Sequence, residues 1–189
     1  MPFVLWYFVF RAPVFGFWPT LTFSALRLLL ISLPRLRLMG FRVALRDIAL
    51  GIVSGIALYL FFWSGYQVAK SVPGFVQTIS SVYGLRGGAP PQEITLLLLF
   101  PIGPTEELYW RGLIQRRIRE GLGPNRSLIV TTLLYTAIHL PTFNPSLLLV
   151  AAIGGLVWGA IYNRCGSVVP GIVSHVIFDE MIFVFFVIG

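Results

Sequence analysis

The sequence has few charged residues and only one cysteine. Of its 189 residues, 11% are charged and 57% are hydrophobic, and the mean hydropathy is +0.85. Because a soluble domain carries about 25% charged residues, this chain has too little polar surface to coat a water-soluble globule of its size. Cys165 stands alone, so no internal disulfide can form. The composition therefore argues against a soluble protein and predicts an integral membrane protein.

The positive charge is almost entirely arginine, because Lys70 is the only lysine behind the net charge of +7. A nucleic-acid-binding protein gathers such charge on one solvated face. Here the arginines lie between apolar runs, where the positive-inside rule places them. We therefore expect contact with membrane lipids and no nucleic-acid partner. Residues 1–10 lack a charged region and a small-residue cleavage site, so we expect them to lie in the membrane rather than to form a removable signal.

Apolar runs separated by basic or Pro- and Gly-rich breaks define the segments of the chain. One span takes about 20 residues, so roughly five to seven spans fit. The stretch 3–33 is interrupted by an arginine and two prolines, and predicts either one span at 14–33 with an interfacial lead-in or a tight pair of helices. Residues 68–91 predict a loop with a short interfacial helix. The other predicted spans are 47–67, 92–119, 127–141, 146–163 and 167–188.

The predicted fold is all-α: a polytopic transmembrane helical bundle of about six spans with a polar cavity inside the membrane. There is no internal repeat and no sign of a second domain, so residues 1–189 are expected to form a single membrane domain. Successive breaks between spans lie on alternate sides of the membrane. The breaks on one side contain Lys70 and Arg86, whereas those on the other side are much more basic and are therefore expected in the cytoplasm. The arginines of these basic breaks are Arg35, Arg37, Arg42, Arg46, Arg116, Arg117, Arg119, Arg126 and Arg164.

Ionisable residues interrupt three of the last spans at similar depths. Such groups are costly within a membrane and mark functional sites or wet cavities. At a rise of about 1.5 Å per residue from the basic edges, Glu106 lies about 15 Å, His139 about 20 Å and His175 about 16 Å into the membrane. A carboxylate and two imidazoles from separate spans thus share one layer, which predicts a common site.

Helix geometry separates the two adjacent glutamates. Glu107 and Arg111 are i,i+4 neighbours on one helix face, whereas Glu106 points about 100° away from Glu107. Arg111 is therefore expected to pair with Glu107, which leaves Glu106 free to act as a general base toward water.

Two further i,i+4 pairs lie on the spans that carry the histidines. Because His175 and Asp179 share a helix face, Asp179 could orient an imidazole whose N–H stabilises a developing oxyanion. Tyr135 and His139 share a face in the same way, and Tyr135 is expected to serve in packing.

These residues spell three motifs. Residues 106–111 fit EExxxR, residues 135–139 resemble FxxxH with Tyr in place of Phe, and residues 175–179 fit Hxxx(N/D). In this order and at this spacing they resemble the CAAX protease and bacteriocin-processing (CPBP) family of intramembrane glutamate peptidases, which is related to the type II CAAX prenyl endopeptidase. The resemblance covers residues 92–188, which would be the catalytic core.

The resemblance implies an all-helical bundle with a cavity open toward the cytosol. A glutamate and a histidine would activate water, and a second histidine would form an oxyanion pocket with an Asn or Asp. It implies no metal and no cofactor. Many members have Asn where this chain has Asp179, which can donate a hydrogen bond only when protonated. The implied catalytic residues are Glu106, His139, His175 and Asp179, and the supporting residues are Glu107 and Arg111.

We therefore predict a metal-independent endopeptidase, multi-pass in a prokaryotic cell membrane, that cleaves a peptide or membrane-protein substrate. Three alternatives stay open. Glu106, His139 and His175 would also suit a catalytic zinc ion as two histidines and one carboxylate, although no HExxH is present. A bacteriocin-immunity or scaffold protein could use the same fold without catalysis, and chains of Glu and His also serve as ion or proton relays. The sequence defines neither the substrate nor the oligomeric state.

Overall fold

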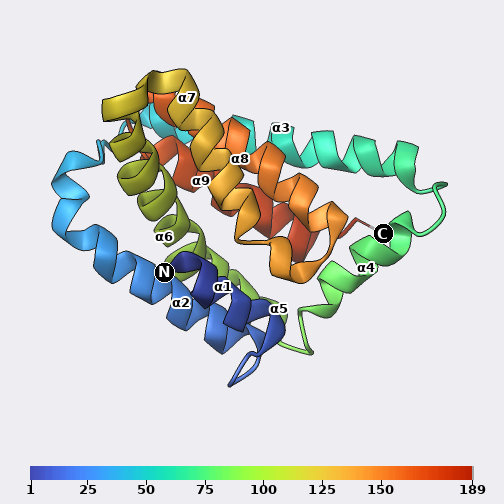
Figure 1. Cartoon of the computed structure of the whole chain (residues 1–189). Coiled ribbons are helices and arrows are strands. Elements are labelled where there is room, and N and C mark those ends of the chain that lie inside the picture. The colour runs from blue at the N-terminus through green and yellow to red at the C-terminus, as the bar shows by residue number, and fades with distance from the viewer. Residues whose placement is uncertain (189) are drawn as a thin grey trace.

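The computed structural model describes residues 1–188, and within that range the chain forms helices and no β-sheet (Figure 1). The α-helices are α1 (Pro2–Arg11), α2 (Phe17–Ser32), α3 (Leu45–Ala69), α4 (Phe75–Gly84), α5 (Pro91–Leu97), α6 (Gly103–Glu107), α7 (Arg116–Ala137), α8 (Pro145–Cys165) and α9 (Val169–Asp179). Two 3₁₀ turns, η1 (Leu33–Leu38) and η4 (Leu140–Thr142), and three π-helical stretches, η2 (Leu98–Ile102), η3 (Leu108–Gln115) and η5 (Glu180–Phe185), connect or extend them. An all-helical architecture is thus confirmed.

The N-terminal stretch consists of a short helix followed by a longer one. Helix α1 has 10 residues, which is too short to span a membrane; it packs on α2, and its buried side chains include Trp6 and Val9. Helix α2 continues through η1, so that Phe17–Leu38 forms one apolar helical segment of 22 residues. The structure combines features of the two arrangements expected for this stretch: α1 and α2 pack against each other as a pair, and the second helix alone is long enough to be a candidate span.

Within residues 1–188, three helical segments are long and apolar enough to cross a membrane: Phe17–Leu38, Leu45–Ala69 and Pro145–Cys165. Their outward side chains are apolar, for example Val53, Leu60 and Leu156. A soluble protein rarely exposes apolar patches of this extent, whereas lipid tails favour them. The membrane character is therefore supported, while the total of about six spans stays a prediction.

The helical stretch that begins at Pro91 alternates between α-helical and π-helical hydrogen bonding near two prolines. Proline has no N–H and its ring clashes with the preceding turn of an α-helix. Pro101 lies inside the π-helical η2, and Pro104 opens the short helix α6, which carries Glu106 and Glu107. Single π-helical turns often occur at functional sites. Here they lie on both sides of the two glutamates.

The predicted break between residues 119 and 127 is formed by Gly123 and Pro124. Gly123 has φ 77° and ψ 175°, a backbone conformation that glycine adopts without steric cost, and it divides α7 into two helices. The second of these leads to His139. The chain thereby returns toward the level of Glu106, as the depth argument requires.

Helices α3 and α9 pack tightly against each other because small residues face α9. A Cβ atom at Gly51 would lie 2.5 Å from Cβ of Val173, and one at Gly55 would lie 2.7 Å from the carbonyl oxygen of Ser174. Glycines four residues apart allow this close approach of helix backbones in membranes. Figure 1 shows α3 along one side of the bundle, α1 and α2 along the opposite side, and α6, α8 and α9 between them. This arrangement places the helix that carries His175 in the interior.

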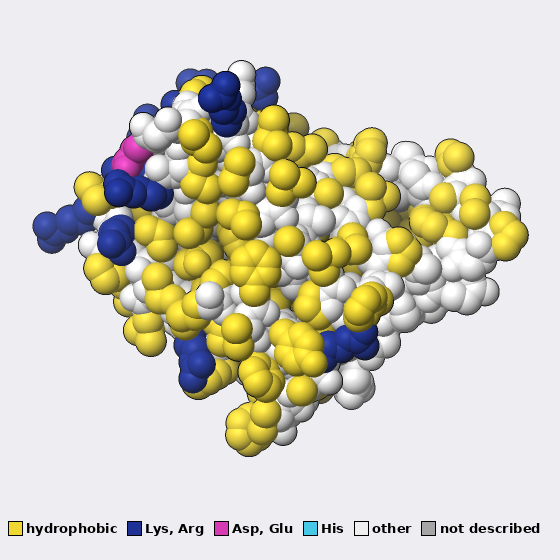
Figure 2. All heavy atoms as spheres, in the orientation of Figure 1, with side chains coloured by type: hydrophobic (Ala, Val, Ile, Leu, Met, Phe, Trp, Pro, Cys, Tyr) yellow, Lys and Arg dark blue, Asp and Glu magenta, His cyan; other side chains and the backbone are white. Residues whose placement is uncertain are grey.

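The surface in Figure 2 divides into a basic end and an apolar face. Most of the visible Lys and Arg side chains gather at the end of the molecule where α7 is kinked, and hydrophobic side chains cover most of the face beyond it. This distribution matches the arginine-rich breaks 34–46 and 116–126 predicted to face the cytoplasm.

Candidate active site

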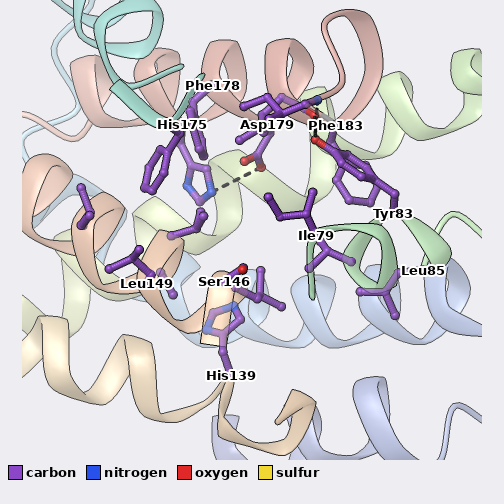
Figure 3. Close-up of a pocket in the computed structure, with 18 of the residues that line it drawn as sticks. Ile79, Tyr83, Leu85, His139, Ser146, Leu149, His175, Phe178, Asp179 and Phe183 are labelled. Carbon is purple, nitrogen blue, oxygen red and sulfur yellow. Dashed lines mark hydrogen bonds and ion pairs between the residues drawn. The ribbon is translucent and has the colours of Figure 1, made fainter. Parts of the chain in front are cut away.

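The four predicted catalytic residues line one cavity of about 530 Å³. Glu106 comes from α6, His139 follows α7, and His175 and Asp179 come from α9. In Figure 3, His139 reaches the cavity from the side opposite His175 and Asp179. The structure therefore brings together side chains that the sequence placed in one layer.

Most of the cavity wall is apolar. Helix α4 contributes Phe75 and Ile79, α1 contributes Trp6 and Phe10, and η5 contributes Phe183. A cavity with many apolar residues and a few convergent polar groups is the usual form of a small-molecule or peptide-binding site. The predicted short interfacial helix within 68–91 is thus α4, and it forms part of this wall.

Glu106 is buried and accepts a hydrogen bond from a tyrosine. The Tyr135 hydroxyl donates to Oε2 of Glu106 at 2.9 Å, whereas Arg111 pairs with Glu107 instead. Glu106 therefore lines the cavity, and no salt bridge to it is found within residues 1–188. This agrees with the helix geometry, which directs Arg111 to Glu107. One of its oxygens is engaged by a phenol and the other is available to a ligand.

His139 is oriented by the end of α7. Its backbone N–H bonds to the carbonyl oxygen of Thr136 rather than to that of Tyr135, as the last helical turn tightens. The Tyr135 carbonyl oxygen instead lies 2.9 Å from Nδ1 of His139. A carbonyl can only accept, so Nδ1 carries the hydrogen, and a neutral ring then has its lone pair on Nε2.

Glu107 forms the centre of a buried polar network outside the cavity wall. Its Oε1 accepts from Arg111 at 3.0 Å, as the i,i+4 spacing predicts, and lies 3.0 Å from Nδ1 of His175. Arg111 also donates to the carbonyl oxygen of Gly155 at 3.2 Å. The side chains of Glu107 and Arg111 are at most 1% exposed. The network thus joins α6, α8 and α9 around the site.

The imidazole of His175 is held on three sides. Trp158 stacks on it with ring centroids 3.8 Å apart and an interplanar angle of 17°. Glu107 contacts Nδ1, and Oδ2 of Asp179 lies 3.4 Å from Nε2, which is long for a hydrogen bond. Asp179 is partly exposed toward the cavity, with 22% of its side chain accessible. The ring plane is therefore fixed, while Nε2 keeps only a weak partner.

Within residues 1–188, no three His, Cys, Asp or Glu side chains are arranged so that they could hold a metal ion. Glu106, His139 and His175 share the cavity, but their hydrogen-bond partners differ: a tyrosine hydroxyl, a backbone carbonyl and a carboxylate. These partners suit proton transfer and hydrogen-bond donation.

Residues 91–181, slightly less than half of the chain, match the model of the family described as type II CAAX prenyl endopeptidase Rce1-like. None of the curated proteins matches the chain, and no solved structure matches it. The match confirms the resemblance inferred from the three motifs, since it spans all of them, and relates the chain through this segment to a family of membrane proteases. At the level of the family, it supports a CAAX-protease-like membrane endopeptidase.

Three contacts of the site were not foreseen in the sequence. Tyr135 was assigned to packing but bonds to Glu106, Glu107 contacts His175 as well as Arg111, and Trp158 stacks on His175. Only the first had a signal in the sequence, namely a hydroxyl where the motif usually has Phe. Trp158 lies within an apolar helix, where its sequence surroundings do not distinguish it from any other buried aromatic residue.

Proposed function

We propose that this protein is an intramembrane, metal-independent endopeptidase in which Glu106 and His139 activate a water molecule. The observation that carries the proposal is the convergence of Glu106, His139, His175 and Asp179 on one largely apolar cavity. The family match supports the reaction class, and the contacts within the cavity support the division of roles.

The reaction begins with proton transfer to Glu106. A water molecule in the cavity gives one proton to the free oxygen of Glu106. The other O–H of this water donates a hydrogen bond to Nε2 of His139. The water oxygen attacks the carbonyl carbon of the scissile peptide bond and forms a tetrahedral intermediate. Proton return from Glu106 to the leaving nitrogen breaks the carbon–nitrogen bond, which releases an amine and a carboxylic acid.

While the tetrahedral intermediate exists, His175 stabilises its oxyanion. Its Nδ1 donates to Glu107, so Nε2 has a hydrogen to donate only when the ring is protonated on both nitrogens. In that form the ring is an imidazolium between the carboxylates of Glu107 and Asp179, and its Nε2 hydrogen, whose contact with Asp179 is long, is donated to an oxyanion that lies in front of Nε2. Asp179 is thus assigned to support the charge of His175.

The substrate is a peptide or a membrane protein whose scissile bond reaches the cavity. The test uses purified protein in proteoliposomes and a library of fluorescence-quenched peptides, half of them carrying an S-farnesyl cysteine near the C-terminus. We expect cleavage detected by fluorescence and by mass spectrometry of both products. Cleavage of the farnesylated half alone would assign the substrate class that the family description names.

The same assay distinguishes the alternatives. We expect activity to persist in 1,10-phenanthroline, because Glu106 takes the proton without a Lewis acid. Loss with the chelator and return with zinc alone would instead favour the metal-dependent hydrolase. Absence of cleavage across the whole library would overturn the peptidase proposal in favour of a protein without catalytic activity, either an immunity or scaffold protein or an ion or proton relay.

A further inference from the structure

Tyr135 is the residue of the site whose chemistry the motif comparison leaves unexplained. The motif has Phe at this position, and tyrosine adds only a hydroxyl. A buried phenol needs a hydrogen-bond partner. In the structure that partner is Oε2 of Glu106, 2.9 Å away, in a part of the molecule where Tyr135 is 4% and Glu106 is 5% exposed.

The same residue also contacts the second member of the water-activating pair. The carbonyl oxygen of Tyr135 accepts from Nδ1 of His139 at 2.9 Å, because the end of α7 has released it from the helical ladder. One residue therefore holds Glu106 through its side chain and His139 through its backbone.

The phenol ring has no freedom to move the hydroxyl away. The ring of Tyr135 makes edge-to-face contacts with Trp110, His139 and Trp158, at centroid distances of 5.6, 5.1 and 6.3 Å. The guanidinium carbon of Arg111 lies 4.9 Å from the ring centroid. Packing on all these sides directs the hydroxyl to one place. The direction of the hydrogen bond is consequently set by the core and not by Glu106.

We propose that Tyr135 is a positioning residue that aligns Glu106 and His139 on the same water molecule. The proposal rests on the proposed peptidase function. The hydroxyl occupies Oε2, so that Oε1 of Glu106 is the oxygen that meets water, and the carbonyl holds His139 in the tautomer with a free Nε2. Proximity and alignment of this kind lower the barrier of the chemical step without changing how the substrate binds.

The test is Tyr135→Phe, which keeps the ring and restores the residue type usual in the motif. Without the hydroxyl the carboxylate of Glu106 loses the bond that fixes its rotamer. We expect kcat to fall about 10- to 100-fold, the range for loss of one hydrogen bond to a charged group, while KM changes less than about twofold because binding contacts are retained. The substrate is the peptide of the quenched library that wild-type protein cleaves fastest.

The matched control is Tyr59→Phe. Tyr59 is also a buried tyrosine, and its hydroxyl donates to the carbonyl oxygen of Phe186 at 3.1 Å, away from the cavity wall. This variant removes one tyrosine hydrogen bond without touching Glu106, so kcat is expected to stay at the wild-type value. Thermal unfolding of both variants gives the folded fraction by which each rate is normalised.

The outcomes separate this inference from the proposed function. If Glu106→Gln loses kcat relative to wild type but Tyr135→Phe keeps the wild-type kcat, the positioning role is wrong and the peptidase function stands. A loss in Tyr135→Phe that disappears after normalisation, or that is matched by Tyr59→Phe, also overturns the inference. If wild type cleaves no peptide, the function fails and the positioning role fails with it.

Discussion

Replacing Glu107 by Gln is expected to destabilise the protein far more than the same change at Glu106. Glu107 is fully buried, and its Oε1 serves both Arg111 and His175 at 3.0 Å. Removing one partner of a buried ion pair leaves an uncompensated charge and costs about 3–5 kcal/mol. In a chain of this length each kcal/mol lowers Tm by roughly 2–4 °C, so Glu107→Gln should lower Tm by about 6–20 °C.

Glu106→Gln is the matched comparison. The amide oxygen that this change introduces can still accept from the Tyr135 hydroxyl, and no arginine is left unpaired, so the cost should stay below about 1 kcal/mol. The assay is thermal unfolding in detergent micelles, followed by intrinsic tryptophan fluorescence. A second change, Arg111→Met, should recover most of the stability lost in Glu107→Gln, because the stranded charge is removed. Equal Tm losses at positions 106 and 107 would refute this division between the glutamates.

Two other predictions concern orientation and the oxyanion pocket. In a Cys165→Ser background, a cysteine at exposed Gly121 should react with a membrane-impermeant maleimide only from the cytosolic side, and one at exposed Ser71 only from the outside; the reverse pattern would contradict the arginine-based orientation. Asp179→Asn should lower kcat on the order of 10²-fold, because the neutral amide no longer supports a charged His175. Wild-type activity in Asp179→Asn would instead assign Asp179 to hydrogen-bond donation, which Asn supplies permanently.

The sequence predicts the helical segments well because hydropathy and helix breakers are local signals. The predicted spans 47–67 and 146–163 lie within α3 and α8, and the predicted break between residues 119 and 127 contains the Gly123–Pro124 kink. The Glu107–Arg111 pair is equally local, since the i,i+4 spacing alone brings these side chains together.

The remaining features depend on how helices cross, which no local pattern encodes. Glu107 and His175 are 68 residues apart and meet only because α6 packs on α9, where a Cβ atom at Gly171 would lie 2.9 Å from Oε2 of Glu107. The stacking of Trp158 on His175 likewise depends on the placement of α8 against α9. The π-helical turns around Glu106 were not foreseen, although Pro101 and Pro104 are residues that interrupt the hydrogen bonding of an α-helix.

The most direct test of the central claim is the turnover rate of Glu106→Gln in proteoliposomes. An amide cannot take a proton from water, and general-base catalysis contributes about 10²–10⁴-fold. We therefore expect kcat on the fastest-cleaved quenched peptide to fall by that factor, with an unfolding temperature close to that of wild type. A folded Glu106→Gln protein that cleaves this peptide at the wild-type rate would contradict the assignment of Glu106 as the group that activates water.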